Sequence, residues 1–140
     1  MERFSRLACQ AAAEGSVLLY NEKDTLPVKE DTNIAVFGRI AFNYYKSGTG
    51  SGGLVNTRYV MNIIDALKEC PGITLNEKVL AAYEEWISEN PFDIGQGWGG
   101  EPYCQQEMPL DDGLVETAAK ESDVAVMAGG EYSQKPIKWP

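Results

Sequence analysis

The stretch Ile34-Ala35-Val36-Phe37-Gly38 decides the fold of this chain. Its continuous apolar character is typical of a strand buried on both faces, which favours a central place in a parallel sheet over an edge. A loop follows at Tyr44–Gly53, made of an aromatic pair, one lysine and many glycine, serine and threonine residues. Glycine lets backbone N–H groups approach a polar ligand closely, and such a loop is costly to order, so we expect it to serve function.

Helical and strand patterns alternate on both sides of this strand. Three helices are predicted after the glycine loop: one contains Val60, Ile63, Ile64 and Leu67 and stops at Cys70-Pro71-Gly72, one is capped by Asn76 and ends before Asn90-Pro91, and one is capped by Asp111 or Asp112. The remaining predicted elements are a helix at Phe4–Glu14, which ends near Gly15, and strands at Val17–Tyr20, Asn33–Phe37 and Asp123–Ala128. This alternation predicts an α/β fold, a three-layer α/β/α sandwich with a mostly parallel sheet.

Length and composition favour one domain. The chain has 140 residues, of which 44% are hydrophobic and 24% charged, so it can bury a core of its own. We expect a sandwich domain over residues 1–131 and a tail over residues 132–140, where no periodic pattern remains. Phe92–Asp112, rich in glycine and proline, predicts a long irregular segment that serves function or packs against another surface.

The charge of the chain excludes several classes of partner. Its formal net charge is −9, and its cations are scattered, which argues against nucleic acid and against anionic membrane surfaces. A neutral or cationic partner fits better. The sequence shows neither a long apolar run nor a signal-peptide pattern, which predicts an intracellular, cytoplasmic protein.

Histidine is absent, which removes histidine-based nucleophilic catalysis and imidazole metal ligation from this chain. The cysteines, Cys9, Cys70 and Cys104, are widely spaced and indicate neither a zinc site nor a disulfide framework. We therefore predict no metal and no cofactor. Proton transfer would fall to a carboxyl, lysine, tyrosine or cysteine side chain.

Gly48, Gly50 and Gly53 formally match the dinucleotide motif GxGxxG, with Glu69 near the position of its acidic residue. However, Gly48 lies ten residues beyond Gly38, whereas the first glycine of that motif belongs at the turn directly after the strand. A polar, uncharged ligand such as a sugar suits the loop better than a nucleotide.

Two further features each have two interpretations. Trp98, Tyr103 and Tyr44 could stack on a sugar ring, or they could anchor loops to the core or to another domain. Glu131 follows a predicted strand and two glycines, at the edge where open α/β folds bind ligands. Burial there would make it a general acid, whereas solvation would leave it a surface residue.

The chain resembles the α/β sandwich domain of glycoside hydrolase family 3, the β-glucosidase group. The matching segments are Ala11–Glu22 with Leu26-Pro27, Ile34–Arg39, Tyr44–Asn56, Trp98 with Glu101-Pro102, Glu107–Leu110 and Ser122–Val126. The resemblance implies a sheet of about six strands, packed in whole enzymes against a (β/α)8 barrel with the sugar bound between them. It also implies retaining hydrolysis, with an aspartate nucleophile from the barrel and a glutamate acid/base from the sandwich domain.

By position, the resemblance assigns the acid/base role to Glu131 and makes Lys46, Ser47, Gly48 and Thr49 the segment that faces the sugar cleft. Relatives continue after that glutamate with further acidic residues, whereas this sequence reads Tyr132–Pro140. We therefore expect part of an enzyme that acts on a β-linked glucoside or oligosaccharide and is inactive without its barrel. A non-catalytic sugar-binding or partner-binding module is the alternative. Apolar surface left without the barrel predicts a homo-oligomer.

Overall fold

The structure is a computed structural model of the chain. It describes residues 2–23, 25–44, 55–96, 100, 102 and 104–129. The predicted site residues Lys46, Ser47, Gly48, Thr49 and Glu131 lie outside this described part, as does the predicted tail at 132–140.

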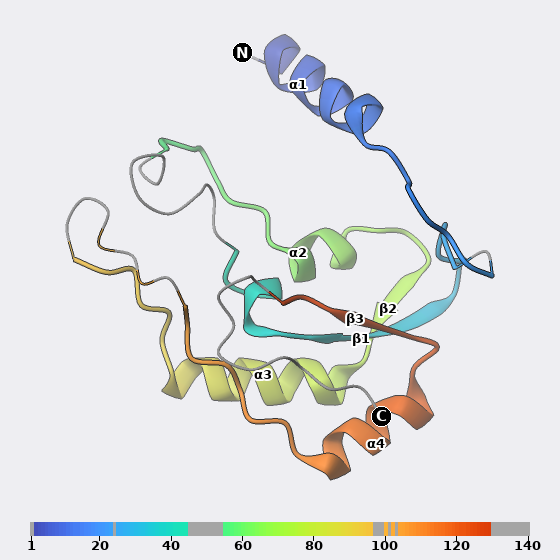
Figure 1. Cartoon of the computed structure of the whole chain (residues 1–140), viewed down its shortest axis with the longest axis vertical. Helices are drawn as coiled ribbons and strands as arrows, with labels where there is room; N and C mark the ends of the chain where they lie inside the picture. The colour runs from blue at the N-terminus through green and yellow to red at the C-terminus, as the bar shows by residue number, and fades with distance from the viewer. Residues whose placement is uncertain are drawn as a thin grey trace.

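The described residues form a parallel sheet of three strands in the order β2-β1-β3 (Figure 1). The central strand is β1 (Thr32–Phe37), as its apolar sequence predicted; β2 spans Ile73–Leu75 and β3 spans Val124–Met127. β1 pairs with β2 over residues 32–34 and with β3 over residues 34–37. The six strands implied by the family resemblance stay a prediction.

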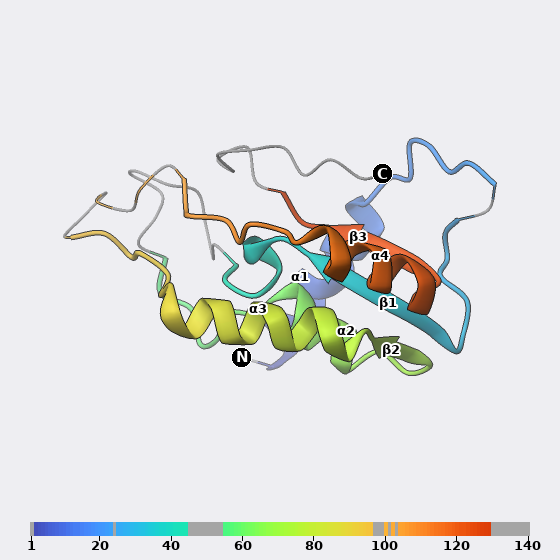
Figure 2. The same cartoon turned by 90° about the horizontal axis from the view of Figure 1, so that it is seen from below.

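Helices cover both faces of this sheet. On one face, α3 (Glu77–Glu89) and α4 (Asp112–Glu121) pack against Ala35 and Phe37 through Val79, Tyr83 and Ala118. On the other face, α2 (Ile63–Lys68) buries Ile64 against Ile34 and Val36 (Figures 1 and 2). The alternation of inward side chains along β1 therefore builds two cores, and the predicted α/β/α layering is confirmed.

Side-chain caps fix where the covering helices begin. The Asn76 side chain accepts hydrogen bonds from the backbone N–H groups of Lys78 and Val79, and Asp111 accepts one from Leu114 at the start of α4. Both positions were predicted as caps, and the structure selects Asp111 over Asp112. Each cap satisfies donors that a helix terminus would otherwise leave unpaired.

The structure differs from the sequence analysis at two places in the middle of the chain. The helix predicted to include Val60 begins only at Ile63, because the Asn62 side chain accepts the Asp65 N–H and starts the helix there. The strand β2 was not predicted, because its three residues, between Gly72 and the Asn76 cap, are too few to show a period.

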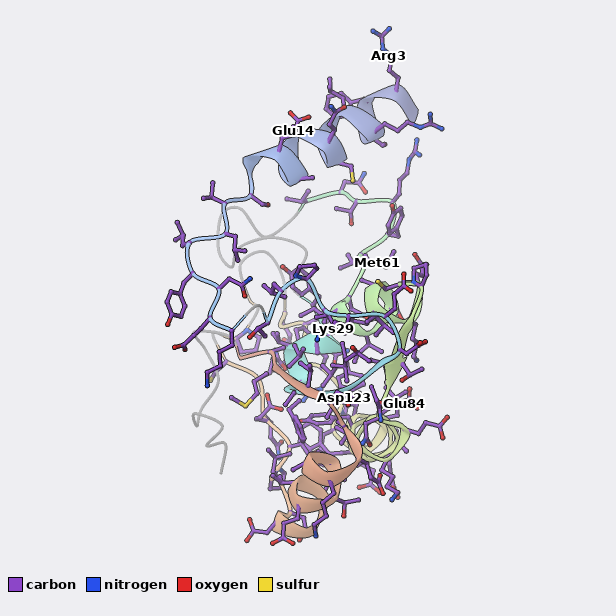
Figure 3. All side chains as sticks on the ribbon, turned by 90° about the vertical axis from the view of Figure 1, so that its right-hand side faces the viewer. Arg3, Glu14, Lys29, Met61, Glu84 and Asp123 are labelled. Carbon is purple, nitrogen blue, oxygen red and sulfur yellow. The ribbon has the colours of Figure 1, made fainter. Side chains whose placement is uncertain are left out.

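The N-terminal part stands away from the sheet. The predicted helix is confirmed as α1 (Glu2–Gly15), but the strand predicted at Val17–Tyr20 is wrong, since the chain there is irregular and Leu19 is 91% exposed. Within the described residues this segment pairs with none of the strands of the sheet, and an extended segment without a partner is unstable. Figure 3 shows α1, marked by Arg3 and Glu14, well separated from Asp123 at the start of β3.

In the described ranges, every helix is too short or too polar to cross a bilayer. Between Phe92 and Asp111, the described residues contain neither helix nor strand, as the glycine and proline content predicted.

Candidate functional site at the carboxyl end of the sheet

β1 and β3 end side by side. Phe37 is the register partner of Met127, and the backbone N–H of Ala128 donates to the Phe37 carbonyl over 2.8 Å. After β1 the described chain runs to Tyr44, the first residue of the predicted glycine loop. After β3 it runs to Gly129. Ligands of open α/β sheets bind at this edge, so the two segments that carry the predicted site residues start from one place.

Gly38 brings the two strand ends into close contact. Its φ is +103°, a conformation that side chains rarely permit, and a Cβ atom there would lie 2.0 Å from the Ala128 carbonyl oxygen. The glycine at the end of the fold-deciding stretch is therefore required by both its backbone angle and its neighbour.

Tyr83 supports this turn from α3. Its hydroxyl oxygen accepts the Gly38 N–H over 2.8 Å, and its ring stacks on Phe42 with a centroid distance of 5.1 Å. Burial raises the pKa of Tyr83 above the ordinary tyrosine value, and the nearby Glu107 adds to the shift. The hydroxyl thus stays protonated and hydrogen-bonds to Glu107.

Glu107, in the irregular segment that precedes α4, stabilises the same turn. Its Oε1 accepts hydrogen bonds from the backbone N–H groups of Arg39 at 2.8 Å and Met108 at 3.3 Å. Burial raises the pKa of this carboxyl, while those hydrogen bonds and the Arg39 charge oppose the rise. The carboxyl is hydrogen-bonded to groups of its own chain, which indicates a structural role rather than that of an acid facing a ligand.

Sequence reasoning did not identify Arg39, Tyr83 and Glu107 as one network. Tyr83 fell within the helix predicted between Asn76 and Asn90, and the other two entered only through the family resemblance. The signal for Arg39 was its position directly after Gly38, at the end of a buried strand, where an arginine is out of place unless it is paired.

Metal binding finds no support in the described part of the chain, since histidine is absent and no group of three cysteine, aspartate or glutamate side chains converges there. Of the aromatic residues considered for sugar stacking, Trp98 and Tyr103 lie outside the described residues. Tyr44, the first residue of the predicted glycine loop, is described and is 52% exposed.

Comparison with known proteins gives a consistent result. Residues 16–135 match the model of the glycosyl hydrolase family 3 C-terminal domain. A β-glucosidase from Ruminococcus albus is 55% identical over 119 residues, which are 85% of this chain but 12% of that protein. The chain therefore spans about one eighth of the length of this relative.

Solved structures agree with the sequence matches. A β-glucosidase from Paenibacillus barengoltzii is 50% identical with a TM-score of 0.81, covering 91% of this chain and 14% of that one. β-Glucosidase 3B from Thermotoga neapolitana, solved in complex with glucose, is 31% identical with a TM-score of 0.76, covering 98% of this chain and 20% of that one.

Proposed function

Because this chain belongs to the glycosyl hydrolase family 3 C-terminal domain family, we propose that it forms one wall of the sugar site of a β-glucosidase-type enzyme. The observation that carries the proposal is the shared end of β1 and β3, fixed by the contact between Gly38 and Ala128. The segment with Lys46, Ser47, Gly48 and Thr49 starts from one strand end, and Glu131 follows the other within four residues of Met127.

In this proposal Glu131 is the general acid/base of a retaining hydrolysis. It donates a proton to the glycosidic oxygen as the C–O bond breaks, and the leaving group departs as an alcohol. It then removes a proton from the water that attacks the glycosyl–enzyme bond, which restores the protonated carboxyl. Lys46 to Thr49 donate hydrogen bonds to sugar hydroxyl groups from the glycine loop.

The nucleophile belongs to another part of the enzyme. Retaining hydrolysis requires two carboxyl groups about 5 Å apart, one on each side of the scissile bond. The proposed second group is an aspartate of a (β/α)8 barrel that packs against this domain. The chain alone is therefore expected to be inactive, although it can still bind a β-linked glucoside at the wall that it contributes.

A chimera tests the proposal directly. The matching segment of the Ruminococcus albus β-glucosidase is replaced by this chain, and hydrolysis of an aryl β-glucoside is measured for the chimera and for the isolated chain. We expect turnover by the chimera and none by the isolated chain. Glu131→Gln in the chimera should reduce kcat by about 10²-fold or more, the usual contribution of general acid–base catalysis.

Glu116→Gln, which removes a carboxyl from the exposed surface of α4, is the matched control and should leave turnover unchanged. Full activity of the Glu131→Gln chimera would contradict the acid/base role. Turnover by the isolated chain that is lost on Glu131→Gln would contradict the need for a barrel.

A further inference from the structure

Arg39 is almost completely buried at the carboxyl end of β1, with 2% of its surface exposed. Its guanidinium donates from Nη1 to the Gln106 carbonyl at 3.1 Å and from Nη2 to the Asn90 carbonyl. These carbonyls stand at the two ends of the segment 91–106. One side chain, placed just after β1, therefore contacts both ends of this segment.

Two aromatic rings also lie beside this cation. The guanidinium carbon lies 5.2 Å from the centroid of the Trp86 ring on α3 and 5.6 Å from that of Phe92, at the start of the segment. Arginine pairs with aromatic faces and with carbonyl acceptors at the same time because its planar group offers donors at its edge. Two members of this environment, the Phe92 ring and the Gln106 carbonyl, belong to the segment itself.

The two legs of the segment are also tied to each other. The backbone N–H of Asp93 donates to the Gln105 side chain over 3.0 Å, and the Gln105 amide donates back to the Asp93 carbonyl over 2.8 Å. The two described legs of the segment are therefore held beside each other by their own hydrogen bonds.

We propose that Arg39 is a positioning residue for the sugar site, because it holds the described legs 91–96 and 104–106 against the carboxyl end of β1. The inference rests on the proposed function, which locates the sugar at that edge. Legs that are held in place before the ligand arrives lower the entropic cost of binding. Arg39 acts through these two legs, without contact to the sugar.

Hydrogen exchange of the purified chain tests the anchor without any sugar. Arg39→Gln removes both donors, Arg39→Lys keeps the charge with a shorter reach, and Lys120→Gln removes a cation from α4 as the matched control. We expect exchange in residues 92–96 and 104–107 to be about tenfold faster or more in Arg39→Gln, intermediate in Arg39→Lys and unchanged in Lys120→Gln.

Exchange within β1 separates a local effect from general loss of structure. If exchange in Arg39→Lys were accelerated equally in β1 and in both legs, the anchoring role of Arg39 would be overturned. The same holds if exchange in the legs were not accelerated at all. Gln105→Ala serves if Arg39→Gln does not fold, since it removes the tie to Asp93 and leaves the Arg39 side chain in place. It should accelerate exchange in the same two legs while β1 stays protected.

Glucose titration, followed by tryptophan fluorescence, tests the link to the site. We expect Arg39→Gln to bind about tenfold more weakly than the wild type, with partial recovery in Arg39→Lys. Equal affinities in the presence of a loosened segment would overturn the positioning role. A wild type whose fluorescence does not respond to glucose contradicts the proposed sugar site. The comparison of hydrogen exchange between wild type and Arg39 variants still tests the anchoring role, so the two failures are distinguishable.

Discussion

At the scale of single residues, the carboxyl end of β1 is fixed by three constraints of different kinds. Gly38 supplies a backbone angle, Tyr83 supplies an acceptor for its N–H, and Glu107 supplies an acceptor for the next N–H. Backbone groups in a buried turn must be satisfied in this way, or the fold loses the free energy of their hydration.

Substitution of Gly38 by alanine should destabilise the fold severely. The new Cβ would lie 2.0 Å from the Ala128 carbonyl oxygen at a φ of +103°, so strain and overlap act together. We expect the free energy of unfolding in urea to fall by about 3 kcal/mol. Gly129→Ala is the matched control, because a Cβ there meets nothing within 4 Å. Equal stability of the two variants would contradict the close contact.

Stability should also depend on the ionisation of Glu107. Its folded-state pKa is raised, so the folded protein holds a proton that the unfolded chain releases, and stability falls as pH rises through the window just above the ordinary glutamate value. Glu107→Gln removes this loss. Chemical unfolding from pH 4 to pH 8 should therefore show the variant gaining stability relative to the wild type as pH rises.

Glu116→Gln controls for the loss of one negative charge in that series, since its side chain is exposed on α4. A stability difference between Glu107→Gln and the wild type that stays constant with pH would show that ionisation of Glu107 does not contribute.

At the scale of elements, Asn76 links three of them. Its side chain caps α3, its amide donates to the Ser122 hydroxyl at the end of α4, and its backbone N–H donates to the Ile34 carbonyl of β1. Asn62 caps α2 in a similar way through the Asp65 N–H. The Asn76 side chain thus accepts two N–H groups where Asn62 accepts one, and it adds the bond to Ser122.

Asn76→Ala should cost about 2 kcal/mol of unfolding free energy, because it loses a cap and a partly buried hydrogen bond. Asn62→Ala, which loses a cap alone, should cost about 1 kcal/mol. Thermal or urea unfolding of both variants measures the difference. Equal losses would show that the bond to Ser122 adds nothing to the cap.

The elements that could be predicted from sequence are those with a strong local signal. β1 follows from continuous apolarity, and the starts of α3 and α4 follow from their capping residues. β2 is too short for a period, and Val17–Tyr20 looks like a strand although it pairs with no strand in the described part of the chain. The network of Arg39, Tyr83 and Glu107 depends on contacts between distant segments, which local patterns do not encode.

At the scale of the whole molecule, the described chain divides into a packed body and an N-terminal part with exposed apolar side chains. Phe4 and Leu7 on α1 are 76% and 63% exposed, and the segment Val17–Tyr20 is equally open to water. Apolar surface of this extent is typical of regions that contact another polypeptide. Self-association of the isolated chain is the outcome that we expect.

Light scattering should therefore show dimers or larger species at high concentration. Leu19→Glu, placed where the side chain is 91% exposed, should shift the chain toward the monomer, because a charge there opposes burial of the surface. Ile94→Glu introduces the same change on the 91–106 segment and should have a smaller effect. A wild type that remains monomeric would contradict the expectation.

The order β2-β1-β3 also constrains synthesis on the ribosome. The central strand can pair with β2 soon after residue 75 emerges, but its other edge has no partner until Val124–Met127 follow. Until then an apolar strand edge stays open to other nascent chains. Closure of that edge is therefore a step that the strand order postpones until residue 127 has been synthesised.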